Sequence, residues 1–183
     1  MKELSRSAAT TERVHLGAMK RLTLLRHAKT ETQHSGQEDW DRELEPRGRK
    51  DAPEMARRLR ERKLKPDRII TSPAVRALAT ANIFAKELHV AGSKLVQDER
   101  LYLASPKVIR EVIRELGGSE AHLMIVGHNP GLTEFADRIC AEREIDNMPT
   151  CAIYTLEFEL ADWSGLEWDS GVNAELDYPK NCW

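Results

Sequence analysis

An arginine and a histidine stand side by side directly after the short, largely apolar run of residues 22–25. Such a run is typical of a β-strand buried in a sheet, and its end would deliver Arg26 and His27 to the rim of that sheet. A guanidinium holds anions through charge-assisted hydrogen bonds, and a neutral imidazole is a nucleophile. The pair therefore indicates a site where an anion is held and attacked.

The segment around residue 70 has a related pattern. Residues 69–71 look like a strand end, Ser72 is a natural helix N-cap, and Pro73 suits the first helical position. We therefore expect Arg76 in the opening turn of a helix. A helix that starts at the carboxyl end of a parallel strand offers backbone N–H groups and a positive dipole end to an anion.

A third segment, residues 123–131, again combines a strand, a tight turn and a helix start. His128 stands at the strand end, Asn129 is the expected cap, and Pro130 follows it. Two arginines and two histidines would then surround two helix starts at one edge of the sheet. This constellation predicts a phosphate pocket.

These segments together resemble the histidine phosphatase superfamily, whose hallmarks are Arg-His-Gly near the N-terminus, Ser-Pro-x-x-Arg in the middle and Gly-His later. Further blocks at residues 41–48, 101–105, 127–131 and 149–152 are similar to those of the SixA-type phosphohistidine phosphatases. The resemblance runs from about Arg21 to Pro179. Each block alone is a weak signal, but their order and spacing together are specific.

The resemblance implies the phosphoglycerate-mutase-like fold, an α/β three-layer sandwich with a mainly parallel central sheet flanked by helices. It also implies a metal-independent phosphatase that works through a covalent phosphohistidine on His27. Where no metal balances the charge of the transferring phosphoryl group, arginines and a cationic imidazole can do so. Arg26, Arg76 and His128 are the predicted catalytic residues for that role, and they also bind the substrate.

A proton donor for the leaving group is the least defined part of the predicted site. Glu99 lies where the mutase-like families place their catalytic acid, and Asp98 is the neighbouring alternative. Leu103 and Ala104 follow where those families have a glycine, as in the SixA-type branch. When the leaving group is an imidazole, a strong acid matters less, so a poor donor would favour P–N over P–O cleavage.

Other departures from the family pattern concern the segment after His27. Ala28 replaces the usual glycine, and Lys29 adds positive charge to the pocket. Gln33 stands where many relatives have an asparagine that touches the phosphoryl group, and we predict Gln33 and Asn129 as further substrate-binding residues. Residues 28–45 are too long for a simple connection, and we expect them to form a substrate-facing loop.

Apolar strands alternate with helical periodicity along the rest of the chain, which favours a parallel sheet covered by helices. Ala52, Met55, Ala56 and Leu59 recur at helical spacing and should face the sheet, and Pro53 should start that helix or kink it. The expected strands are residues 22–26, 68–71, 94–96, 122–126 and 153–159, with an edge strand within 171–178. The expected helices are residues 55–62, 73–88, 106–116 and 131–140.

Composition fits one domain, which we expect over residues 19–183, preceded by a flexible extension at 1–18 with Met19 as an alternative start. Without a long apolar stretch or a signal sequence, we expect a cytoplasmic protein that does not enter a membrane.

The three cysteines form no Cys-x-x-Cys pair and should be free thiols. The histidines outside the pocket share no ligand-like spacing, so we predict neither a metal nor a cofactor.

The net charge of −2 hides a basic excess over residues 42–68. Arginines and lysines between 57 and 65 are expected to form the solvated face of a helix, although they could also steer an acidic partner toward the site. Asp41 and Arg42 are expected to pair and hold the loop near the site. Because the basic excess is local and not interleaved with aromatic residues, the sequence does not indicate nucleic-acid binding.

Four functions remain open at this stage. The leading one is dephosphorylation of a phosphohistidine on a protein, because the short span from Arg76 to His128 leaves little room for a cap over the pocket. The others are a small-molecule phosphomonoesterase acting on a sugar or nucleotide phosphate, a phosphoglycerate mutase, and a non-catalytic phosphate-binding module. The expected partner is accordingly a phosphorylated protein or a small phosphorylated metabolite.

Overall fold

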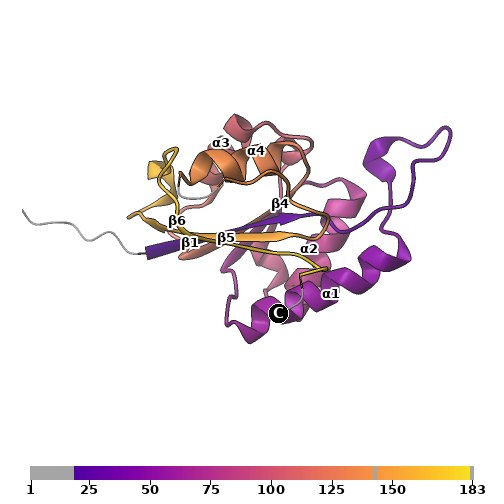
Figure 1. Ribbon diagram of the computed structural model, residues 1–183, viewed down its shortest axis with the longest axis horizontal. Helices are drawn as coiled ribbons and strands as arrows, with labels where there is room; N and C mark the ends of the chain where they lie inside the picture. The colour runs from indigo at the N-terminus through magenta and orange to yellow at the C-terminus, as the bar shows by residue number, and fades with distance from the viewer. Residues whose placement is uncertain (1–18, 142–143, 182–183) are drawn as a thin grey trace, which may run out of the picture.

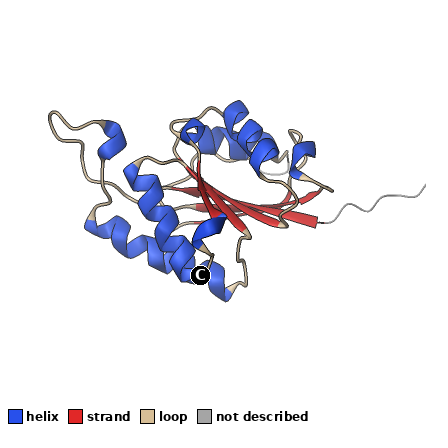
Figure 2. Cartoon of the chain, turned by 180° about the vertical axis from the view of Figure 1, so that it is seen from behind, coloured by secondary structure: helices blue, strands red, loops and turns tan. Residues whose placement is uncertain are grey.

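The computed structural model describes residues 19–141 and 144–181, which form a six-stranded sheet between two layers of helices (Figures 1 and 2). The strand order across the sheet is β3-β2-β4-β1-β5-β6. The strands are β1 (Met19–Arg26), β2 (Arg68–Thr71), β3 (Leu95–Gln97), β4 (His122–Gly127), β5 (Ile153–Glu159) and β6 (Val172–Asp177).

Four of these strands are parallel. β1 pairs with β4, β4 with β2 and β2 with β3 in the same direction, whereas β5 and β6 complete the sheet as antiparallel strands. Every residue of β4 is buried, as expected for a central strand covered on both faces. The mainly parallel sheet predicted from the sequence is therefore confirmed.

Two helices cover each face of the sheet (Figure 1). α1 (Pro46–Glu61) and α2 (Val75–Glu87) lie on one face, and α3 (Pro106–Leu116) and α4 (Gly131–Ile139) lie on the other. Separate apolar clusters fill the two interfaces between the sheet and its helices. Short 3-10 helices occur at η1 (Asp39–Asp41), η2 (Gly92–Lys94), η3 (Glu99–Leu101) and η4 (Trp163–Gly165). The three-layer architecture is the one expected.

The first helix is longer than predicted. α1 begins at Pro46 rather than near residue 55, and Pro53 lies inside it instead of starting it. Pro46 suits the first turn of a helix because the N–H it lacks would have no partner there. The four apolar residues expected to face the sheet, Ala52, Met55, Ala56 and Leu59, are all buried.

Two predicted helix caps were wrong. Ala74 rather than Ser72 is the N-cap of α2, and Pro130 rather than Asn129 is the N-cap of α4. Neither cap residue makes a side-chain hydrogen bond to its helix. Ser72 Oγ still accepts from the N–H of Ala74 at 3.3 Å, and Asn129 Oδ1 from the hydroxyl of Thr133. Both side chains also contact distant residues, as described below.

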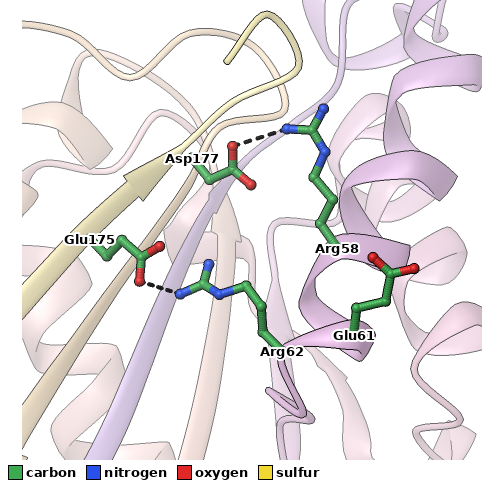
Figure 3. A pocket seen from close by; sticks show the side chains of 5 residues that line it. All are labelled: Arg58, Glu61, Arg62, Glu175 and Asp177. Carbon is green, nitrogen blue, oxygen red and sulfur yellow. Dashed lines mark hydrogen bonds and ion pairs between the residues drawn. The ribbon is translucent and has the colours of Figure 1, made fainter. Parts of the chain in front are cut away.

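The basic face of α1 is not simply solvated. Figure 3 shows Arg58 of α1 and Arg62, the residue that follows this helix, reaching to acidic residues of β6. Arg58 Nη1 lies 3.1 Å from Oδ1 of Asp177, and Arg62 pairs with Glu175. Asp177 is only 2% exposed, so its charge is neutralised inside the molecule. We call this contact between α1 and β6 the seam.

Three expectations concern other parts of the chain. No helix in the described part of the chain has the length and apolar character needed to cross a membrane. Cys140 and Cys151 are buried and free, as predicted, whereas Cys182 lies outside the described residues. The proposed extension at residues 1–18 also lies outside them, and Met19 is the first residue of β1.

Candidate active site

A cleft of about 460 Å³ opens where β1 and β4 end. Adjacent strands bring its central residues together, because Arg26 at the end of β1 pairs in register with Gly127 at the end of β4. His27 and His128 follow directly. The cleft is lined by Arg26, His27, Lys29, Thr30, Asp39, Arg42, Arg76, Leu103, His128, Asn129 and Thr150. All four of the predicted core site residues are therefore brought together.

Backbone contacts fix His27 on both sides. Its N–H donates to the carbonyl of Gly127, and its own carbonyl accepts from the N–H of Cys151, each at 3.1 Å. Its ring Nδ1 lies 2.8 Å from the carbonyl oxygen of Ala28. Because a carbonyl only accepts hydrogen bonds, Nδ1 must carry the proton, and Nε2 is left with a free lone pair. The ring is thus held as a nucleophile that presents Nε2.

The electrostatic environment keeps His27 neutral. Burial, together with the charges of Arg76 and Arg26, lowers the pKa of its imidazole to about 4, against the opposing effect of the Ala28 hydrogen bond. The side chain is 8% exposed. At neutral pH the ring is therefore unprotonated at Nε2, which is the form that can attack phosphorus.

His128 lies beside this nucleophile, with a distance of 5.2 Å between the two ring centroids. Its Nε2 is 2.8 Å from the hydroxyl oxygen of Ser72. Burial, and then the neighbouring His27 and Arg76, lower its pKa to about 3. His128 is therefore neutral here rather than cationic as predicted, although a phosphoryl dianion against it would raise its pKa.

The side chain of Thr80 connects the arginine of α2 to the nucleophile. Its hydroxyl donates to the carbonyl of Arg76 at 2.7 Å and accepts from the N–H of Ala28 at 3.0 Å. Arg76 is 2% exposed. The first turn of α2 and the backbone after His27 are therefore fixed relative to each other by one buried side chain, which the sequence analysis did not identify.

Several buried polar atoms of the cleft have no hydrogen-bond partner within the described residues. They include Nε of Arg26, Nε of Arg76 and Nδ1 of His128. Buried polar groups are nearly always paired in native proteins, and exceptions gather where a ligand binds. Burial also lowers the pKa of Arg26. This part of the molecule is thus short of negative charge and of acceptors, which fits an anionic ligand.

Asp39 is the one acidic side chain among the described residues that line the cleft, and no pattern in the sequence indicated it. Its Oδ2 accepts from Arg76 Nη2 at 2.7 Å and from the Tyr102 hydroxyl at 2.8 Å. Although burial alone would raise it, hydrogen bonds from Arg42, Tyr102 and Arg76 lower the pKa of Asp39 to about 2. The ionised carboxylate therefore occupies the same guanidinium that is expected to hold phosphate.

The loop of residues 28–45 is held at the cleft by this aspartate. Arg42 pairs with Asp39 at 3.0 Å, not with Asp41 as predicted, and donates to the hydroxyl of Thr30 at 2.6 Å. Trp40 packs edge-on against Tyr102, with 4.7 Å between the ring centroids. The prediction that this segment faces the substrate site agrees with the position of Asp39, Arg42 and Thr30 in the cleft lining.

Three predicted residues do not reach the cleft lining. Glu99 is exposed in η3, and Asp98 is engaged by Arg100, whose Nη2 lies 2.8 Å from Asp98 Oδ2. Gln33 is exposed and donates to the carbonyl of Gln37 at 2.8 Å. Neither acidic residue therefore lines the cleft in this structure.

Asn129 does line the cleft, but its side chain is committed to neighbouring groups. Its amide nitrogen donates to the carbonyl of Met148 at 3.1 Å, and its oxygen accepts from the hydroxyl of Thr133 at 3.0 Å. Arg26 Nη1 donates to the same Met148 carbonyl at 2.7 Å. Asn129 thus helps to hold the segment that positions Arg26. Within the described residues, His, Cys, Asp and Glu form no group of three or more suited to a metal ion.

Comparisons with known proteins agree with this geometry. The model of the histidine phosphatase superfamily (branch 1) matches residues 22–102. Uncharacterized protein MT1313 of Mycobacterium tuberculosis (strain CDC 1551 / Oshkosh) is 32% identical, over 78% of this chain and 92% of its own length. The chain belongs to the histidine phosphatase superfamily.

Solved structures place this member among the SixA-type proteins. One from Agrobacterium tumefaciens, provisionally assigned as the phosphohistidine phosphatase SixA, is 26% identical with a TM-score of 0.70, covering 76% of this chain and 92% of that one. The protein histidine phosphatase SixA complexed with tungstate has the same fold, with a TM-score of 0.73 at 18% identity over 87% of this chain and 97% of that one. Together with the family, these likenesses support a phosphatase hydrolase.

Proposed function

We propose that this phosphatase removes the phosphoryl group from a phosphohistidine on a protein, through a covalent phosphohistidine on its own His27. The observation that carries the proposal is the hydrogen bond from His27 Nδ1 to the carbonyl of Ala28, 2.8 Å long, which leaves Nε2 unprotonated. A pKa of about 4 keeps the ring in this form at neutral pH.

In the first step, Nε2 of His27 attacks phosphorus, and the P–N bond to the substrate ring breaks as the new P–N bond forms. The substrate ring enters protonated on its other nitrogen and therefore leaves as neutral imidazole. Arg26, Arg76 and His128 surround the transferring group and balance the charge on its equatorial oxygens. In the second step, water attacks the phosphorylated His27, and inorganic phosphate leaves with the water oxygen. The pair of steps replaces one difficult displacement with two easier ones.

The described residues that line the cleft include no protonated acid, which favours a phosphohistidine over a phosphoester. The carboxyl group among the cleft-lining residues belongs to Asp39. Its pKa of about 2 means that it carries no proton at neutral pH. An alkoxide needs a proton to leave, whereas an imidazole is a much better leaving group. Glu99, the acid on which the phosphoesterase alternative depends, is exposed and outside the lining.

The test is hydrolysis of a phosphohistidine-bearing protein compared with a panel of sugar and nucleotide monophosphates, without added metal and with a chelator. Wild type and His27→Ala are compared, with Glu99→Gln as a second variant. The proposal predicts fast P–N cleavage, weak P–O cleavage, loss of both in His27→Ala and no effect of Glu99→Gln. Strong turnover of one small phosphoester that depends on Glu99 would contradict the proposal and indicate a metabolic phosphatase. No turnover of any substrate would indicate a phosphate-binding module without catalytic activity.

A further inference from the structure

We propose that a second hollow beside the catalytic cleft is a subsite for an acidic group on the substrate, an aspartate or glutamate side chain near the phosphohistidine. The hollow has a volume of about 300 Å³ and is lined by Lys29, Arg47, Asp51, Pro149, Thr150, Tyr178, Pro179 and Lys180. The inference rests on the proposed function, because it takes the phosphoryl group to be bound at His27.

The hollow adjoins the cleft, and two residues are common to both linings. Lys29 and Thr150 line both of them. Lys29 follows the nucleophile by two positions, so a group that enters the hollow lies close to the phosphoryl site. A substrate whose phosphoryl group contacts His27 therefore passes Lys29 and Thr150 as it extends toward Arg47.

The wall between the two spaces is fixed by the start of α1. The N–H of Glu45 donates to the carbonyl of Lys29 at 3.1 Å. A Cβ atom at Gly48 would lie 2.1 Å from that same carbonyl oxygen, so only glycine permits the helix to approach this closely. The backbone of Lys29 is thus clamped on α1, beside Arg47, and both cations are delivered to one rim.

The ion pairs around the hollow are weak enough for a ligand to compete. Lys29 Nζ lies 3.4 Å from Glu45 and is 48% exposed, and Arg47 Nε lies 3.4 Å from Asp51 and is 46% exposed. Exposed pairs of this kind contribute little free energy. A carboxylate on a substrate can therefore exchange for either acidic partner at small cost.

The charge of the combined surface also favours an acidic ligand. In a chain with a net charge of −2, the linings of the cleft and the hollow carry a strong excess of cations. The acidic residues are Asp39 and Asp51. The basic ones are Arg26, Lys29, Arg42, Arg47, Arg76 and Lys180. A carboxylate next to the phosphohistidine would complement this field, which also increases the rate of encounter.

The experiment uses two phosphohistidine peptides that differ only in having glutamates or glutamines beside the phosphorylated residue. The readout is the ratio of kcat/KM for the glutamate peptide to kcat/KM for the glutamine peptide. Arg47→Gln should lower this ratio about fivefold, and Asp51→Asn, which removes the competing carboxylate, should raise it. Arg49→Gln is the matched control, because Arg49 is also on α1 but pairs with Glu43 and does not line the hollow.

Opposite changes of the ratio in Arg47→Gln and Asp51→Asn would support the subsite, because a purely structural role would not move the ratio in opposite directions. Equal ratios in all variants would overturn it. If wild type cleaves neither peptide, the proposed function fails, and the subsite is then tested with 3-phosphoglycerate against glycerol 3-phosphate, which differ by one carboxylate. Preference for 3-phosphoglycerate that depends on Arg47 would assign the acidic group to a small substrate instead, and no preference would overturn the subsite as well.

Discussion

The catalytic cleft and the seam between α1 and β6 are both rich in arginines, but they differ in how far the arginines are paired with partners inside the molecule. In the seam, Arg58 meets the buried carboxylate of Asp177 at 3.1 Å, and Arg62 meets Glu175 (Figure 3). In the cleft, buried nitrogen atoms of Arg26 and Arg76 lack partners within the described residues. Charges that hold a fold are neutralised within it, whereas charges that bind a ligand are left short of partners.

The largest effect that separates the two regions is expected from an arginine in the cleft. Arg76→Ala should lower kcat/KM by roughly 10²- to 10³-fold, by analogy with the loss of one donor to a developing negative charge. The free energy of unfolding is measured on the same sample by urea denaturation. A fall in activity that merely follows a loss of folded protein would contradict a role in catalysis.

The matched substitution in the seam should have the reverse profile. Arg58→Ala leaves Asp177, which is 2% exposed, without its partner and should lower the free energy of unfolding by about 3 kcal/mol. Its kcat at a temperature where the variant is folded should equal that of wild type. A large loss of kcat in the folded variant would show that the seam contributes to the active site.

Asp39 gives the cleft one ion pair of the kind found in the seam, because its carboxylate pairs with Arg76 at 2.7 Å. Asp39→Asn removes that competitor and should strengthen inhibition by inorganic phosphate several-fold, because Arg76 is buried and Asp39 is half-buried. The inhibition constant is measured from initial rates. Weaker inhibition in the variant would mean that Asp39 positions Arg76 rather than competing with its ligand.

The smallest predicted effect concerns pH. The pKa of His27 is lowered from its ordinary value of 6.5 to about 4, so the nucleophile loses its lone pair only as the pH falls through about 4. The rate of the phosphorylation step should be flat between pH 5 and 7 and halved near pH 4. Because the histidine of the unfolded chain takes up a proton near pH 6.5, the free energy of unfolding should decline as the pH falls from about 6.5 to about 4. An inflection of the rate near pH 6.5 would contradict the buried, neutral imidazole.

The sequence predicted the parts of the site that depend on local pattern. The apolar runs before Arg26 and His128 end at the same edge because their strands pair in register, and the first turn of α2 carries Arg76 to that edge. Ser72 was predicted to cap a helix, and its hydroxyl accepts from the N–H of Ala74, but it also contacts His128 across the sheet edge. Strand ends can be located from sequence, whereas the partner of a short polar side chain depends on packing between distant segments.

The position of Glu99 outside the cleft lining also depends on packing. Asp98 caps η3 by accepting from the N–H of Arg100, and Leu101 is buried, so the intervening Glu99 is exposed. The acidic group at the cleft comes instead from Asp39, which is far away in sequence and is held by Arg76, Tyr102 and Arg42. No periodicity in the sequence indicates that contact, because it depends on how the loop of residues 28–45 folds back.

The central claim is that His27 carries the phosphoryl group between two chemical steps. The most direct measurement is rapid quenching of the enzyme with ³²P-labelled phosphohistidine protein, followed by mapping of the label. The account predicts a transient, alkali-stable and acid-labile phosphate on the peptide that contains His27, absent in His27→Ala. Turnover with no labelled enzyme at any time, or label on a residue other than His27, would contradict it.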